Sequence, residues 1–324
     1  MEGNLIGVFG SNPQSKQAFL SSIGKKSETE GMVVYQRNEG GKKFSFLDDQ
    51  TYPEKIQGYA RIASISDYSY YLFPPDGKLQ PSDGELAILL DSFNLPGSIE
   101  VLDGSKAAAA SVIASSFKGL APASFDIDER DSKSWVIDLS KVSSGRKYPR
   151  DSTLVYIDRA FNVKGVGLVV LGFVLSGKVS VHDRLRLIPS DAEKYAEVKG
   201  IQVSDEDYDT TGRGIRVGLS LKGVELKDLS KVSWMDDGSL KLSSEINFEF
   251  RQSRYYKQPT ADRDLHLQAN GETLVARVSQ GAGGGNQRTA KLTASIPVWQ
   301  DMRVCVLDLN SKPLRLAGGG TVIL

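Results

Sequence analysis

The stretch YIDRAFNVKGVGLVVLGFVLSGKVSVHDRLRLIP, spanning Tyr156–Pro189, decides how the second half of the chain folds. Its apolar residues fall into short runs separated by turn residues. Gly165 and Gly167 suit a tight turn with a bulge, where side chains would collide. The run Val169–Leu175 is apolar except for one glycine, as expected for a strand in a barrel core. The stretch therefore predicts neighbouring strands of a β-barrel.

Similar short strands and turns continue toward the end of the chain, with almost no helical periodicity. A break at Trp234–Gly238 divides them into two sets. The first set includes Arg184–Pro189, Val198–Val203 and Ile215–Leu221, and the second includes Ile246–Arg251, Thr273–Val278 and Met302–Leu307. We therefore expect two all-β barrel domains, at residues 149–237 and 238–324.

Residues 1–148 show a different pattern, in which short apolar strands alternate with helices. Met32–Arg37 and Lys42–Leu47 predict a hairpin, because Asn38–Gly41 between them is a turn signature. Ser82–Glu85 is typical of a capping box at the start of an apolar helix. A last helix is expected from Asp131 to about Val142. This alternation predicts an α/β domain with a mostly parallel sheet covered on both faces.

The composition excludes several classes of protein. Forty basic and 40 acidic residues give zero net charge, which argues against a strongly electrostatic nucleic-acid binder, and no DNA partner is expected. The sequence contains no run of 18 apolar residues, so no membrane-spanning helix is expected. The N-terminus carries no secretory signal, so we expect a cytoplasmic protein. One cysteine and two histidines exclude a disulfide framework and make a metal site unexpected.

Charge is nevertheless uneven along the chain. Residues 238–324 carry 11 basic and 7 acidic residues, a net charge of +4. Arg251, Arg254, Lys257 and Arg263 lie close together in this part and are candidate contacts for RNA. The alternative is an ordinary solvated surface.

Five motifs in and after the opening stretch resemble domain II of the translational GTPases, and most closely that of the selenocysteine-specific elongation factors. They are Ile157–Phe161, Val163–Gly167, Leu175–Val179, Val198–Val203 and Gly212–Val217. The resemblance implies a P-loop-GTPase-like (G) domain followed by two β-barrels, the EF-Tu-like architecture. This order agrees with the layout expected for the whole chain. In the first domain the resemblance is one of topology more than of motifs.

The expected phosphate loop departs from the family pattern. A GTPase wraps phosphates with G-x-x-x-x-G-K-[ST], whose lysine reaches the phosphates and whose hydroxyl holds Mg²⁺. Gly10 and Lys16 keep this spacing, but Ser15 replaces the second glycine and Gln17 replaces the hydroxyl residue. Pro13 also removes one amide donor. We therefore expect that GTP and Mg²⁺, the cofactors implied by the resemblance, are not used.

The switch segments depart in the same direction. Lys25–Gly31, where switch I is expected, is too short to fold over a γ-phosphate. In the switch II segment Asp48 is kept, but Thr51 replaces a glycine and Tyr52 replaces the histidine that orients the attacking water. A β-branched residue suits close approach to a phosphate poorly.

The guanine-reading segment is altered as well. It begins at Asp103, and Lys106 stands where the family has the aspartate that pairs with guanine. We interpret the first domain as a degenerate GTPase domain without catalytic residues. Its nucleotide-binding remnants are Gly10, Lys16, Asp48 and Asp103. Lys16 and Asp48 are expected to be structural remnants or surface charges.

The resemblance also implies a pocket for the aminoacyl end of a tRNA. Asp158, Arg159 and Arg216 match the residues that line this pocket in the selenocysteine-specific factors. Paired arginines would favour an anionic selenol over a hydroxyl, and the aspartate could bind the α-amino group or orient the arginines. The alternative is an ion-pair cluster at a barrel rim.

Three functions remain open from the sequence. The first is a translation factor that binds aminoacyl-tRNA through both barrels without GTP turnover. The second is a protein-interaction module of the translation machinery, in which the first domain is a docking surface. The third is an atypical but working GTPase. The chain ends just after Leu316–Val322, which closes the last barrel, so a complete selenocysteine delivery factor is not expected.

Overall fold

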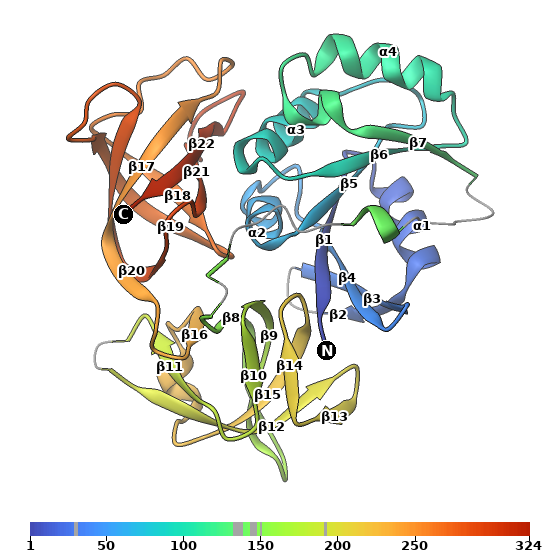
Figure 1. The fold of residues 1–324 in the computed structure, drawn as a ribbon. Coiled ribbons are helices and arrows are strands. Elements are labelled where there is room, and N and C mark those ends of the chain that lie inside the picture. The colour runs from blue at the N-terminus through green and yellow to red at the C-terminus, as the bar shows by residue number, and fades with distance from the viewer. Residues whose placement is uncertain (29–31, 132–138, 143–147, 150, 191–192) are drawn as a thin grey trace.

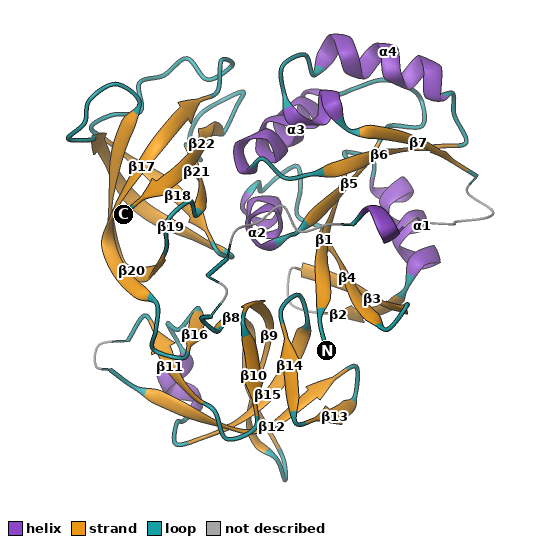
Figure 2. Cartoon of the chain, viewed as in Figure 1, coloured by secondary structure: helices purple, strands orange, loops and turns teal. Residues whose placement is uncertain are grey.

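The protein consists of an α/β domain and two β-barrels grouped around a common centre (Figure 1). The computed structural model describes residues 1–324 except 29–31, 132–138, 143–147, 150 and 191–192. Figure 2 shows the α-helices in the N-terminal domain, whereas the barrels consist almost entirely of strands. This arrangement confirms the predicted fold class. Within the described ranges, no helix combines the length and the hydropathy that a bilayer crossing requires.

The N-terminal domain is built on a mixed sheet in the order β2-β3-β4-β1-β5-β6-β7. Strands β4, β1, β5, β6 and β7 run parallel, and β2 and β3 join antiparallel at one edge. The elements are β1 (Gly3–Phe9), α1 (Pro13–Ile23), β2 (Lys25–Glu28), β3 (Met32–Glu39), β4 (Lys42–Asp49), α2 (Gln57–Ile65), β5 (Tyr68–Leu72), α3 (Pro81–Phe93), β6 (Gly97–Leu102), α4 (Lys106–Ser116) and β7 (Asp126–Arg130).

Local sequence signals account for several of these elements. The predicted hairpin is β3–β4, and Gly40 and Gly41 adopt φ angles of 58° and 75°, which glycine tolerates best. The predicted capping box at Ser82–Glu85 is wrong, because the box is formed two residues earlier by Gln80 and Asp83. The predicted helix at 131–142 lies mostly outside the described residues, although Leu139–Lys141 forms a 3-10 turn.

Helices cover both faces of the sheet, as the alternating pattern predicts. On one face, Phe19, Leu20 and Ile23 of α1 pack against apolar residues of β1, β3, β4 and β5. On the other face, α2, α3 and α4 bury residues such as Tyr59 and Leu86 in a core that continues into the barrels. Burial of apolar surface is therefore shared between the N-terminal domain and its neighbours.

The first barrel closes because β11 pairs with both β16 and β12. Its main sheet has the order β11-β16-β8-β9-β15-β12-β13. The strands are β8 (Leu154–Val163), β9 (Gly167–Ser176), β10 (Lys178–Ser180), β11 (Arg184–Ile188), β12 (Tyr195–Val203), β13 (Glu206–Tyr208), β14 (Thr210–Gly212), β15 (Arg216–Lys222) and β16 (Trp234–Asp236). The opening stretch of the sequence thus forms β8 to β11, with Gly165 and Gly167 at the β8–β9 turn.

The second barrel is a closed antiparallel ring in the order β17-β20-β19-β18-β21-β22. Its strands are β17 (Lys241–Gln252), β18 (Arg263–Ala269), β19 (Glu272–Gln280), β20 (Gln287–Val298), β21 (Arg303–Leu307) and β22 (Leu316–Ile323). Strand β22 lies directly against α3. A Cβ atom at Gly319 would come within 2.1 Å of the Ser92 carbonyl oxygen, so this close approach requires glycine.

Polar contacts also join the three parts. Arg315 before β22 binds Glu85 of α3, with Nε 3.0 Å from Oε1. Trp234 of the first barrel is fully buried and donates its indole N–H to the Asn270 carbonyl of the second barrel at 2.7 Å. The backbone N–H of Gly3 donates to the carbonyl of Arg213 at 2.9 Å. The barrels and the N-terminal domain therefore form one packed unit.

Candidate functional site

The loop after β1, where a GTPase holds phosphates, is tied to its own protein groups. Asn12 caps α1, and its side-chain oxygen accepts the Ser15 N–H at 2.8 Å. The Ser11 hydroxyl donates to the buried Asp83 carboxylate of α3 at 2.9 Å. Amides and hydroxyls at a helix N-terminus bind an incoming phosphate only when they are free, and here two of these donors are already used.

Lys16 is buried, and its ammonium is bonded to protein oxygens. Its ammonium lies 2.9 Å from Asp48 Oδ1 and 3.4 Å from the Asp49 carbonyl oxygen, and it also contacts the Tyr59 hydroxyl. Tyr59 in turn donates to Asp48 Oδ1 at 2.8 Å. The exposed fractions of Lys16 and Asp48 are 4% and 5%, so of the two expected alternatives, structural remnants or surface charges, the second is wrong. An ammonium has three donors, and this arrangement uses all three.

The electrostatics of this pair follow from burial. Loss of water raises the pKa of the Asp48 carboxyl above its ordinary value, and the charge of Lys16 and its hydrogen bond oppose that shift. Lys16 therefore favours the charged form of Asp48. A lysine that balances a buried carboxylate is poorly placed to reach a phosphate as well.

The side chains at the magnesium and water-orienting positions have structural partners. Gln17 Nε2 donates to Ser21 Oγ at 2.9 Å and to the Tyr35 hydroxyl at 3.2 Å. Tyr52 is buried, and its hydroxyl donates to the Ser82 carbonyl of α3 at 2.6 Å. Gln17 has only an amide oxygen in place of the hydroxyl that holds Mg²⁺ in the family, and the Tyr52 hydroxyl is already bonded to the Ser82 carbonyl.

The segment expected to read guanine begins α4. Asp103 is exposed, with a φ angle of 47°. Ser105 caps the helix by accepting the Ala108 N–H at 3.3 Å. The backbone N–H of Lys106 donates to Glu129 at 3.4 Å, and its side chain is exposed. The loop after β1, Lys16 and the segment from Asp103 to Lys106 therefore fit GTP and Mg²⁺ poorly.

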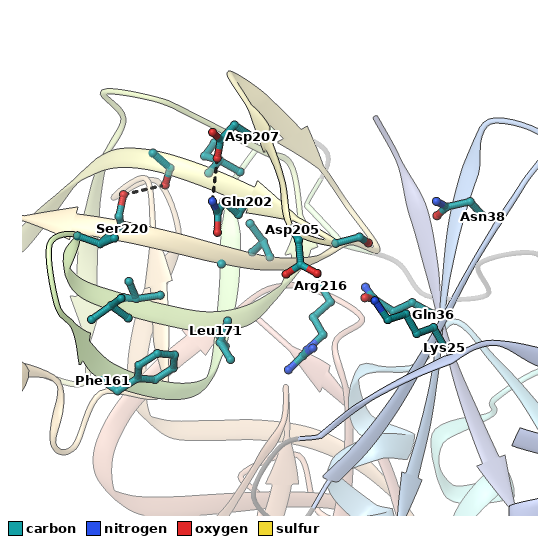
Figure 3. A pocket seen from close by; sticks show the side chains of 18 of the residues that line it. Lys25, Gln36, Asn38, Phe161, Leu171, Gln202, Asp205, Asp207, Arg216 and Ser220 are labelled. Carbon is teal, nitrogen blue, oxygen red and sulfur yellow. Dashed lines mark hydrogen bonds between the residues drawn. The ribbon is translucent and has the colours of Figure 1, made fainter. Parts of the chain in front are cut away.

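A cavity of about 720 Å³ lies between the first barrel and the sheet of the N-terminal domain. Figure 3 shows Arg216 in this cavity, with Asp205 of the barrel on one side and Lys25 and Gln36 of the N-terminal domain on the other. Most of its apolar wall comes from β8, β9 and the turn between them: Phe161, Val163, Val166, Val169 and Leu171. The volume suits a small organic ligand or a terminal nucleotide.

The N-terminal wall of this cavity was not expected from the sequence. Lys25 and Lys26 belong to β2, which pairs with β3 at the sheet edge. The expectation of a short switch I loop at Lys25–Gly31 is therefore wrong for residues 25–28, and 29–31 lie outside the described residues. The only available signal was the β3–β4 hairpin, which leaves a free edge for another strand.

The three predicted pocket residues occupy different environments. Arg216 is buried in the cavity wall. Asp158 is half-buried at a bulge in β8, where the pairing with β9 shifts between Ile157 and Arg159. Burial raises the pKa of the Asp158 carboxyl, and the charges of Arg216, Arg61 and Arg159 oppose the shift. Arg159 itself is exposed.

Arg61 of α2 is a residue that the sequence did not single out. It is half-buried where the three parts meet. Burial would lower its pKa, but its neighbours Tyr156, Glu272 and Asp158 raise it. These neighbours come from both barrels, so one guanidinium of the N-terminal domain interacts with each of them. The one sequence signal that could have pointed to Arg61 was its charge, in a helix whose other residues are mostly buried.

The four basic residues of the second barrel make contacts within the protein. Arg251 pairs with Asp91 of α3 at 2.8 Å, and Arg254 contacts the Lys118 carbonyl after α4. Arg263 pairs with Asp308 at 2.9 Å, and the Lys257 ammonium donates to the Arg254 carbonyl at 2.5 Å. Their assignment to RNA stays a prediction, and it must now allow for these partners. Within the described ranges, no group of His, Cys, Asp or Glu could hold a metal ion.

An α/β domain with a loop-and-helix turn after its first strand, followed by two closed barrels, defines the architecture of three-domain translation factors. Residues 167–233 match the family described as elongation factor Tu domain 2. Over 125 residues the chain is 42% identical to the selenocysteine-specific elongation factor of Methanocaldococcus jannaschii; the match covers 38% of this chain and 26% of that protein.

Two comparisons extend over the whole chain. An uncharacterized protein of the same archaeon is 27% identical over 323 residues, 99% of each chain. The crystal structure of the apo form of translation elongation factor SelB from Methanococcus maripaludis superimposes with a TM-score of 0.77 and 18% identity, covering all of this chain and 80% of that one.

The chain is similar in sequence to translational GTPases in its first barrel and similar in fold to them over its whole length. The curated relatives of known role that it resembles are the selenocysteine-specific elongation factors. The match to those curated relatives spans only about a quarter of their length.

Proposed function

We propose that this protein binds the acceptor end of an aminoacyl-tRNA through its barrels and does not turn over GTP. The observation that carries the proposal is the cavity beside the first barrel, whose wall contains the buried Arg216. The curated relatives are elongation factors, which makes components of the translation machinery the natural partners.

The chemistry of the cavity supports an RNA end with a charged substituent. Arg216, Lys25 and Lys26 can bind phosphate or carboxylate oxygens, and Asp205 can bind an ammonium group. Phe161 offers an aromatic surface for a base. An aminoacylated 3′ end carries a phosphate, a base and an α-ammonium group, and so matches all three features.

Arg216→Ala is expected to weaken binding of aminoacyl-tRNA by about tenfold to a hundredfold, because a hydrogen bond to a charged group contributes about 1.5–3 kcal/mol. Arg159→Ala is expected to have a smaller effect, since Arg159 is exposed and outside the cavity wall. Filter binding with a panel of charged and deacylated tRNAs measures both.

Arg277→Ala is the matched control, because it removes the same charge from an exposed site on the second barrel. If Arg216→Ala and the parent protein bind aminoacyl-tRNA equally well, the cavity is not the binding site. If the parent binds no tRNA and instead retains an RNA-free protein partner, the interaction module becomes the better account.

Calorimetry with GTP and GDP at millimolar Mg²⁺ tests the nucleotide half of the proposal. The missing carboxylate at Lys106 removes two charge-assisted bonds to guanine, which weakens binding by about two to four decades. We expect no binding with micromolar affinity for either nucleotide. A nucleotide-binding elongation factor is the positive control. Micromolar affinity would favour the working GTPase.

A further inference from the structure

Ser64 joins helix α2 to the second barrel by hydrogen bonds, in addition to the apolar contacts between them. Ser64 is fully buried, and its hydroxyl oxygen accepts the Gly271 N–H at 2.8 Å and the Gln268 Nε2 at 3.2 Å. Gly271 has a φ angle of 100° and packs against the ring of Tyr156, where a Cβ atom would lie 2.5 Å from that ring. Ser64 therefore meets the second barrel at the point where it touches the first.

Arg61, one turn before Ser64, adds electrostatic interactions between α2 and the two barrels. It interacts with Glu272, the residue after Gly271, and with Asp158 beside the cavity. Helix α2 thus supplies one of the charges around Asp158. Any rotation of α2 would disturb both barrels together.

The first half of α2 is held by the Lys16 cluster. Tyr59 is fully buried and bridges Lys16 and Asp48 with its hydroxyl, and the Lys16 ammonium lies 4.9 Å from the centre of the Tyr59 ring. At Gly58 the helix approaches β4 so closely that a Cβ atom would lie 2.0 Å from the Asp49 carboxylate. Directional bonds and close packing thus fix α2 on its sheet side.

We propose that Lys16, with Asp48 and Tyr59, is a positioning group that holds α2 and thereby fixes both barrels against the N-terminal domain without a bound nucleotide. Two sets of contacts, at Tyr59 and at Ser64, lie on one rigid helix about one and a half turns apart. A buried ion pair is often retained because it specifies one arrangement rather than because it adds stability.

The proposal concerns domain arrangement and does not rest on RNA binding. Its test therefore contains no RNA, and failure of one proposal leaves the other intact. The amide of Gly271 is a direct reporter, because its hydrogen bond crosses from the second barrel to α2. Hydrogen exchange at this amide measures how often that contact opens.

Tyr59→Phe keeps the ring and removes the hydroxyl that joins Lys16 to α2. We expect exchange at Gly271 to become about tenfold faster, while core amides of β9 in the first barrel keep their rates. Tyr70→Phe is the matched control, since Tyr70 is equally buried but lies on the α1 face of the sheet. A second variant, Lys16→Met with Asp48→Leu, removes the whole ion pair without leaving a lone charge.

Exchange at Gly271 that stays at the parent rate in both variants overturns the proposal. A rise equal to that in the Tyr70→Phe control also overturns it, because the effect would then be general loosening. Addition of GTP and Mg²⁺ to the parent protein is expected to leave the rate unchanged. Slower exchange with nucleotide would mean that the ligand, and not Lys16, fixes the arrangement.

Discussion

Lys16→Met is expected to lower the free energy of unfolding by about 3–5 kcal/mol, the cost of leaving one partner of a buried ion pair without the other. Asp48 would keep the Tyr59 hydrogen bond but lose its counter-charge in an environment that already raises its pKa. Urea unfolding followed by circular dichroism measures the change.

The loss should depend on pH in a direction set by Asp48. A carboxyl whose pKa is higher in the folded state than in the unfolded state destabilises the fold as pH rises through that interval. The variant should therefore gain stability relative to the parent as pH falls from neutral toward the carboxyl range. Lys16→Met with Asp48→Leu should recover most of the loss. A cost below about 1 kcal/mol for Lys16→Met alone would contradict the buried pairing.

Trp234→Ala is expected to cost about 3–5 kcal/mol, as for other large aromatic side chains removed from a core. Trp234 is fully buried where the barrels meet, and its loss also leaves the Asn270 carbonyl without its indole donor. Thermal and urea unfolding followed by circular dichroism measure the change without relying on tryptophan fluorescence.

Trp234→Phe separates packing from the hydrogen bond. It keeps an aromatic ring but has no N–H, so we expect a smaller loss of about 1–3 kcal/mol. If alanine and phenylalanine cost the same, the hydrogen bond and not the ring would dominate the junction. If neither variant is destabilised, the barrels do not depend on this contact.

The fold could be predicted from the sequence because its signals are local. Alternating strands and helices, glycine-rich turns and the motifs between Tyr156 and Val217 depend on residues near one another in the chain. Element starts were less certain: Pro81 and Gln80 take the helix-starting roles that the pattern placed at Ser82. Strand β2 was missed because its pairing with β3 is its main determinant.

The site could be predicted only in part. Motif spacing identified Lys16 and Asp48, but their burial depends on Tyr59, which no spacing rule connects to them. Arg216 was found by resemblance, whereas Lys25 in the same cavity comes from a strand edge far away in the chain. Contacts between domains bring such residues together, and a single sequence carries little information about them.

The contact of β22 with α3 has a consequence for how the protein can be divided. Gly319 touches the backbone at Ser92, and apolar residues of α2 and α3 are buried against both barrels in one continuous core. An isolated N-terminal fragment would expose the apolar surface of these helices to water and would aggregate. Fragments should therefore be soluble only when co-produced, and the intact chain should melt in a single transition.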